Sequence, residues 1–231
     1  LAASSPLTVA AATPAVSTVR TQISADVQPV VDLLHRVLPS HADLFSLELA
    51  PARTGAVASF SIAAAPTKGH VLITGSDVSA LAAGVLDYLN SVNASVSWAA
   101  TGGDNLVGAL PPPSAGLPAP PAPRERDSPF ARRYVYNTCT YGYSTVWWDW
   151  ARWERELDWM ALHSINTPLS MLGTEWAWRE TFVHDFGLNR SELDDFFPGP
   201  AFLPWHWMGN LDGWNAGSPR PLPDAWLERG R

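Results

Sequence analysis

The sequence predicts an α/β protein in which a small N-terminal α/β sandwich domain precedes the first units of an incomplete (β/α)8 TIM barrel. Three observations favour this fold class. Strand-like and helix-like hydrophobic patterns alternate through the first hundred residues. A dense proline run, PPPSAGLPAPPAP at 111–123, then interrupts both patterns. A strand–helix–strand pattern follows at 134–172, which is one βα unit of a parallel sheet.

Composition shifts along the chain predict its domain boundaries. The first residues carry little structural signal, so we expect a disordered lead-in or the remnant of a signal peptide there. The predicted segments are the lead-in at 1–18, the N-terminal α/β domain at 19–108, a Pro-rich linker at 109–130 and the start of a truncated TIM-barrel catalytic domain at 131–231.

The N-terminal domain is predicted to contain two helices and four strands. Ser24 or Asp26 is the candidate cap of the first helix, and Pro39 ends that helix. Gly75-Ser76-Asp77 opens the second helix with Asp77 as its cap, an interpretation that we prefer to a phosphate-binding loop. The predicted elements are a helix at 24–38, strands at 45–49, 59–63 and 69–75, a helix at 78–89 and a strand at 94–98.

The proline run predicts an extended, semi-rigid connector between the two domains. A ligand for an SH3-type partner is the alternative, but a connector accounts for the run without a partner. The charged residues RERD at 124–127 are expected to form a solvated patch.

The predicted βα unit starts with alternating aromatic and small residues at 134–140 and continues as an amphipathic helix from Asp149. On that helix Arg152 and Glu156 lie one turn apart and can pair. The later predicted elements are a strand at 166–172, a helix at 176–186, a helical turn at 191–197 and an irregular aromatic loop at 201–214.

Tryptophan is concentrated in this second half, which holds all of the 12 tryptophans except Trp98. Indole rings pack on the C–H faces of sugars, and aromatic loops commonly cover binding pockets. We expect the helical Trp150, Trp153 and Trp159 to be core residues. The better candidates for ligand contact are Trp205, Trp207 and Trp214, in the predicted loop.

Two long runs, NTCTYGYSTVWWDWARWERELDWMALHSIN and GPAFLPWHWMGNLDGW, resemble the lysosomal α-N-acetylglucosaminidases, a family of glycoside hydrolases. The resemblance implies an exo-acting enzyme that releases terminal N-acetylglucosamine from heparan-sulfate-type or other glycans with retention. It also implies a lysosomal, vacuolar or secreted location and allows an oligomer for the full-length enzyme. Retention needs two carboxylates, which the family places on later barrel strands, so we expect no catalytic residue within this chain and no activity from it alone.

The same resemblance assigns the sugar pocket to Asn137, Cys139, Trp205 and Met208. Asn137 offers a donor and an acceptor to sugar hydroxyls, and Trp205 with Met208 would form an apolar wall. Cys139 as a covalent nucleophile is the sharper alternative, but no histidine follows at a spacing that suggests a base.

Glu175 follows the second predicted strand and is a weak candidate for a catalytic carboxylate. We prefer to interpret it as a buried hydrogen-bonding residue that supports the first strand. A non-catalytic carbohydrate-binding fragment that uses the Trp-rich loop is the alternative function for the chain.

Composition limits the other classes of partner. A net charge of −7 without a basic run argues against nucleic acid, and no apolar stretch reaches the length of a membrane-spanning helix. The histidines are too dispersed for a metal site, and no cofactor is implied. The single cysteine excludes an internal disulfide. Asn93 and Asn189 lie in sequons and are candidates for glycosylation.

Overall fold

The computed structural model describes residues 27–96, 106–107, 109–194, 196–209 and 222–229. The expected lead-in at 1–18 lies outside this part of the chain. Ser24, Asp26, Trp98 and Trp214 also lie outside it.

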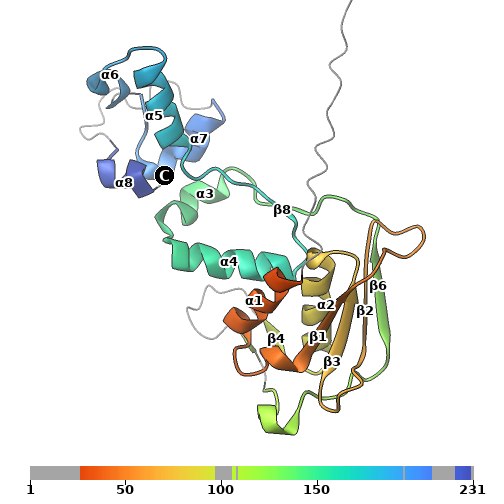
Figure 1. The fold of residues 1–231 in the computed structure, drawn as a ribbon. Helices are drawn as coiled ribbons and strands as arrows, with labels where there is room; N and C mark the ends of the chain where they lie inside the picture. Colours follow the sequence, from red (N-terminus) through yellow and green to blue (C-terminus); the bar gives the residue numbers. More distant parts are fainter. Residues whose placement is uncertain (1–26, 97–105, 108, 195, 210–221, 230–231) are drawn as a thin grey trace, which may run out of the picture.

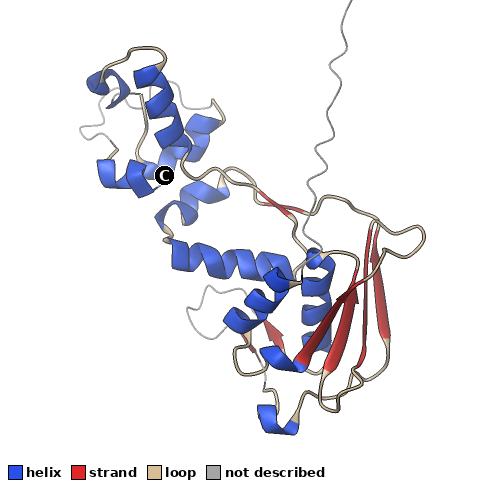
Figure 2. Cartoon of the chain, in the orientation of Figure 1, coloured by secondary structure: helices blue, strands red, loops and turns tan. Residues whose placement is uncertain are grey.

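The N-terminal part is built on a mixed four-stranded sheet with the strand order β1-β3-β2-β6. β1 and β3 are parallel, whereas β2 is antiparallel to both β3 and β6. Two helices, α1 and α2, accompany the sheet (Figures 1 and 2). The elements are α1 (Gln28–Val37), η1 (Ala42–Leu44), β1 (Phe45–Leu49), β2 (Ala58–Ala64), β3 (Val71–Gly75), α2 (Val78–Ser91), β4 (Ser95–Val96), β5 (Leu106–Val107), η3 (Pro113–Ala115) and β6 (Arg124–Ser128).

A helix cap fixes the start of α2, and the apolar face of this helix packs against the sheet to complete the core. The Asp77 carboxylate accepts the Ala80 N–H at 2.8 Å, which confirms the predicted cap. Leu81, Val85 and Leu89 are completely buried within the main apolar cluster. A mixed α/β architecture is therefore confirmed for this part of the chain.

The segment around the proline run is packed on the N-terminal domain. Leu117 belongs to its core, and the Tyr88 hydroxyl donates to the Pro118 carbonyl at 2.8 Å. Gly116 meets Gly69 so closely that a Cβ on either residue would be within 3.0 Å of the other's Cα. The predicted connector is therefore anchored on the N-terminal domain at Leu117 and Pro118, while most of the run, which lies within the described residues, is exposed and has no helix or strand beyond η3.

Residues 124–127 form the predicted solvated charged patch, since Glu125, Arg126 and Asp127 are exposed, but they also have regular structure that the sequence did not indicate. These residues form most of β6, which pairs with β2 from Ala58↔Ser128 to Ile62↔Arg124. Arg124 forms two hydrogen bonds to the Asp87 carboxylate of α2, at 2.8 and 3.0 Å. Charged residues suit this strand because an edge strand leaves one side open to water.

The predicted strand–helix–strand unit is present. Its strands, β7 and β8, are parallel, with Tyr134 opposite Thr167 and Val135 opposite Pro168. Asp149 caps α4 by accepting the Arg152 N–H at 2.8 Å. The elements are β7 (Tyr134–Val135), α3 (Thr140–Tyr143), η4 (Thr145–Trp147), α4 (Trp150–Leu162) and β8 (Thr167–Pro168).

Both strands are shorter than the predicted spans 134–140 and 166–172. The last bond of the β8 ladder is donated by the Leu169 N–H to the Val135 carbonyl at 2.6 Å. After β7, the Asn137 side-chain oxygen accepts the Thr140 N–H at 3.0 Å, and the chain turns into α3.

The remaining described chain is helical. Its elements are α5 (Thr174–His184), α6 (Arg190–Asp194), η5 (Pro200–Phe202), α7 (Leu203–Trp207) and α8 (Asp224–Arg229). α5 covers most of the helix predicted at 176–186. The loop predicted from residue 201 is wrong over η5 and α7, which carry Pro200 and Pro204 at early positions that tolerate proline. Within the described residues, no helix is long and apolar enough to cross a bilayer.

The helical tryptophans differ in burial. Trp153 is 7% exposed, as predicted for a core residue, and Trp159 packs against the N-terminal core. Trp150 is 68% exposed, so its assignment to the core is wrong. It is the first residue of α4, where the helix has not yet reached the N-terminal core.

Candidate functional site

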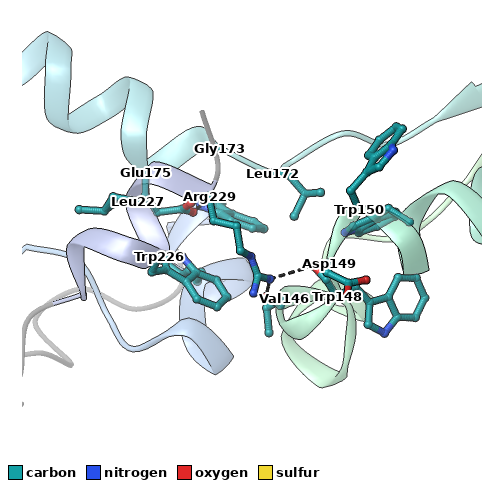
Figure 3. A pocket seen from close by; sticks show the side chains of 13 residues that line it. Val146, Trp148, Asp149, Trp150, Leu172, Gly173, Glu175, Trp226, Leu227 and Arg229 are labelled. Carbon is teal, nitrogen blue, oxygen red and sulfur yellow. Dashed lines mark hydrogen bonds between the residues drawn. The ribbon is translucent and has the colours of Figure 1, made fainter.

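A cleft with a volume of about 180 Å³ lies among the segments that follow β7 and β8 (Figure 3). Its walls come from Val146–Trp153, Leu172–Glu175, α7 and α8. Five tryptophans contribute, namely Trp148, Trp150, Trp153, Trp207 and Trp226. Parallel barrel strands build their sites from the segments at their carboxyl ends, so the cleft lies where that architecture predicts a site. Its volume is below the range of about 300–1,000 Å³ for pockets that enclose a whole ligand.

Glu175 is the buried carboxylate of this cleft. It lies in the first turn of α5 after Gly173, whose φ of +79° suits glycine. The Trp207 indole N–H donates to Glu175 Oε1 at 2.6 Å. Burial raises the pKa of Glu175, while the hydrogen bonds from its own backbone and from Trp207 lower it. Glu175 is thus a buried hydrogen-bonding residue as predicted, but its partner is on α7 rather than on the first strand.

A chain of aromatic contacts joins α7 to α3 and α4. The Trp207 ring meets Tyr141 edge to face, with centroids 6.0 Å apart, and Tyr141 stacks on Trp153 at 5.8 Å. The Tyr141 hydroxyl donates to the Leu169 carbonyl just after β8. Burial raises the pKa of Tyr141 to about 12, so the hydroxyl keeps its proton at neutral pH.

Arg229 closes the opposite side of the cleft. Its guanidinium donates to the carbonyls of Val146 and Trp148, at 2.9 and 2.8 Å, and so ties α8 to the start of α4 (Figure 3). The Arg152 guanidinium lies over the Trp148 ring at 3.8 Å and pairs with Glu156 at 3.0 Å, as the helical spacing predicted.

The four residues assigned to a sugar pocket lie beside this cleft and are absent from its described lining. Asn137 is exposed, and Cys139 is a half-buried free thiol immediately before α3. Trp205, on α7, packs edge to face on Tyr143 at 5.9 Å and over Gly142. Met208 directly follows α7 and is 38% exposed.

The structure therefore brings Trp205 against α3, the helix that begins just after Cys139. Within the described residues, the hydrogen bonds of Asn137 go to Thr140 and the ring contact of Trp205 is with Tyr143, so neither joins two of the four assigned side chains. All four remain accessible from solvent.

Trp226, Arg229 and the pairing of Glu175 with Trp207 were not predicted from the sequence. The run PDAWLER at 223–229, with proline and aspartate at its start, was the available signal for α8. Among the described residues, no group of three His, Cys, Asp or Glu side chains is arranged to hold a metal ion.

Both glycosylation candidates lie on exposed turns. Asn93 has a φ of +59° at the end of α2. The Asn189 oxygen accepts the Glu192 N–H at 3.1 Å and caps α6. Their modification stays a prediction.

Two domain models of one protein family match the chain. The N-terminal domain of α-N-acetylglucosaminidase matches residues 28–119, and the TIM-barrel domain of α-N-acetylglucosaminidase matches residues 133–231. The chain belongs to the α-N-acetylglucosaminidase family. Human α-N-acetylglucosaminidase is 44% identical over 158 residues, which is 68% of this chain and 20% of the human protein.

Solved structures of other family members also resemble this chain. A family 89 glycoside hydrolase from Clostridium perfringens, in complex with PUGNAc, has a TM-score of 0.73 and 32% identity over 88% of this chain and 22% of that one. A variant of the Clostridium enzyme with two glutamates changed to glutamine, in complex with its substrate GlcNAc-α-1,4-galactose, has a TM-score of 0.73 and 31% identity, with the same coverage. The chain thus spans about a fifth of the length of these α-N-acetylglucosaminidase relatives.

Proposed function

We propose that this chain is the N-terminal part of an exo-acting α-N-acetylglucosaminidase, which releases terminal N-acetyl-α-D-glucosamine from heparan-sulfate-type or other glycans. The observation that carries the proposal is the similarity, over 88% of this chain, to a Clostridium enzyme solved with GlcNAc-α-1,4-galactose. The identity to a human protein of this activity supports the same conclusion.

In this proposal Asn137, Cys139, Trp205 and Met208 line one side of the pocket for the terminal sugar. The Asn137 amide would bind a sugar hydroxyl, and Cys139 leaves room beside it. Trp205 and Met208 would pack against the ring and its acetamido methyl. The contact of Trp205 with Gly142 supports the arrangement, because it holds one wall close to the segment that carries the polar groups.

Hydrolysis with retention requires an acid/base and a nucleophile about 5–5.5 Å apart. We propose that both are glutamates outside residues 1–231. Glu175 is already bonded to Trp207 and is 5% exposed, which argues against a role at the glycosidic bond. The two glutamate replacements in the Clostridium substrate complex fit a mechanism with two carboxylates.

The wider biological setting is also proposed. An enzyme acting on heparan-sulfate-type glycans would work in the lysosome, in the vacuole or outside the cell, where Asn93 and Asn189 would be glycosylated. The proposal is compatible with an oligomer of the full-length enzyme.

Titration calorimetry of the purified chain with N-acetylglucosamine tests the pocket. We expect saturable binding at millimolar sugar that Trp205→Ala abolishes. Trp150→Ala is the matched control, because Trp150 lines the neighbouring cleft and not the proposed pocket. Binding that is lost in the Trp150 variant and kept in the Trp205 variant would move the site to the cleft.

A turnover assay tests where the catalytic carboxylates lie. The 231-residue chain should not hydrolyse an aryl α-N-acetylglucosaminide, because both proposed glutamates are outside it. Measurable turnover that survives Glu175→Gln would mean that another group within this chain performs the chemistry.

The alternative is a non-catalytic carbohydrate-binding fragment, which the aromatic character of the described segments favours. A binding module would accept internal N-acetylglucosamine, whereas an exo-acting pocket accepts only a terminal residue. Titration with an oligosaccharide whose only N-acetylglucosamine is internal separates the two, since binding to it would favour the module.

A further inference from the structure

We propose that Glu175 is a positioning residue for the sugar pocket. Its carboxylate fixes Trp207, and Trp207 holds the short helix α7 against α3. α7 carries Trp205 and is followed by Met208, while α3 follows Cys139. The inference rests on the proposed function, and it assigns Glu175 an indirect role without contact to the sugar.

The position of Trp207 in the chain lets it determine where both Trp205 and Met208 lie. It lies two residues after Trp205 and immediately before Met208. α7 has only five residues, and an isolated helix shorter than about 12–15 residues is marginal in water. The orientation of α7 must therefore come from its tertiary contacts, and any displacement of Trp207 moves both pocket side chains.

Glu175 and Tyr141 hold Trp207 by different parts of its side chain. The indole N–H donates to Glu175 Oε1 at 2.6 Å, and the acceptor carboxyl group is almost entirely buried. A short hydrogen bond to a carboxylate is directional, so it fixes the ring plane. The Trp207 ring also contacts the Tyr141 ring edge to face, and Tyr141 in turn stacks on Trp153.

The contact between α3 and α7 leaves no room for an added methyl group. A Cβ on Gly142 would collide with the Trp205 ring and would lie 2.8 Å from the Ala201 carbonyl oxygen. Trp205 is thus already at closest approach to α3. A change in the angle of α7 would separate Trp205 from the segment that carries Asn137.

The alternative role for Glu175 is a general acid at the glycosidic bond. Such a group needs an open path to the substrate and a free proton position. Glu175 lacks the open path, because only 5% of the residue is exposed, and one of its two carboxyl oxygens already accepts the Trp207 N–H. The geometry favours the positioning role.

The test compares the affinity of the 231-residue chain for N-acetylglucosamine among three variants. Glu175→Ala removes the acceptor, Trp207→Phe removes the N–H but keeps a ring, and Glu175→Gln keeps an acceptor oxygen. We expect the first two to weaken binding about tenfold and the third to stay within about threefold of wild type. The double variant Glu175→Ala/Trp207→Phe should bind no more weakly than either single variant, because both remove the same interaction.

Two further measurements separate positioning from general stability. Thermal unfolding shows whether each variant is folded at the assay temperature. The indole N–H resonance of Trp207 should be shifted downfield in wild type and should move in Glu175→Ala. If Glu175→Ala does not fold, Trp207→Phe and Glu175→Gln still decide the question.

The outcomes distinguish this inference from the proposed function. If Trp205→Ala abolishes binding while folded Glu175→Ala and Trp207→Phe bind as wild type does, the positioning role is wrong and the sugar pocket stands. If Glu175→Gln loses as much affinity as Glu175→Ala, the hydrogen bond is not what matters and the inference is overturned. If the wild-type chain binds no sugar, the pocket assignment fails and the positioning role fails with it.

Discussion

Arg36 and Asp158 form a two-bond ion pair that joins α1 of the N-terminal domain to α4. Arg36 Nε donates to Asp158 Oδ2 at 2.8 Å, and Nη2 donates to Oδ1 at 2.7 Å. The hydrogen bond to Asp158 raises the pKa of Arg36. The Asp158 residue is 6% exposed, so its side of the pair is largely shielded from water.

Arg36→Ala should lower the free energy of unfolding by about 2–3 kcal/mol, because it leaves a buried carboxylate unpaired. Urea unfolding measures the loss. The matched control is Arg126→Ala, which removes a more exposed arginine 3.9 Å from Asp87 and should cost less than about 1 kcal/mol. Equal losses in the two variants would contradict a special contribution from Arg36.

Stability should depend on pH through Glu175. Burial raises the pKa of Glu175, so the folded state retains this proton at a pH where the unfolded chain has released it. Wild type should therefore lose stability relative to Glu175→Gln as pH rises from the unfolded value of about 4.3 through the folded pKa. Guanidinium unfolding of both proteins between pH 4 and pH 8 measures the difference; a relative gain for wild type would show that the hydrogen bonds outweigh burial.

Gly142→Ala should destabilise the chain by about 1–3 kcal/mol, because the new methyl group overlaps Trp205 and the Ala201 carbonyl. The direction of the change in stability is informative, since alanine otherwise stabilises a helix by about 0.5–1 kcal/mol relative to glycine. Gly199→Ala is the control, as a Cβ there meets nothing within 4 Å. Thermal unfolding compares the two, and a stabilised Gly142 variant would refute the close approach of α3 and α7.

Arg229→Ala should release α8, because its two hydrogen bonds to the carbonyls of Val146 and Trp148 are lost. We expect a cost of about 1–3 kcal/mol and faster amide exchange in α8, measured by hydrogen exchange. Arg229→Lys keeps the positive charge but not the planar set of guanidinium donors. Its stability should therefore lie between those of wild type and Arg229→Ala. Unchanged exchange in Arg229→Ala would mean that other contacts hold the helix.

Interactions within a few residues of each other were predictable from the sequence. The Asp77 and Asp149 caps and the Arg152–Glu156 pair all lie within one helical turn, and the structure contains each of them. Side-chain chemistry and spacing specify such features without knowledge of the rest of the fold.

Features that depend on distant partners were not predictable in the same way. β6 is a strand only because β2 offers it a ladder more than sixty residues earlier in the chain. Glu175 was a recognisable carboxylate at a strand end, but its partner Trp207 is 32 residues away on a helix that the aromatic pattern had suggested to be a loop. The family resemblance supplied the pocket residues, and spacing alone would not have grouped them.

The closing of the N-terminal sheet by β6 has a consequence for any attempt to isolate that domain. A polypeptide cut at residue 119, where the N-terminal family match stops, would lack β6. β2 would then present bare N–H and C=O groups along one side, a template for strands of other molecules. Such a cut favours aggregation, whereas an endpoint after Ser128 keeps the ladder filled.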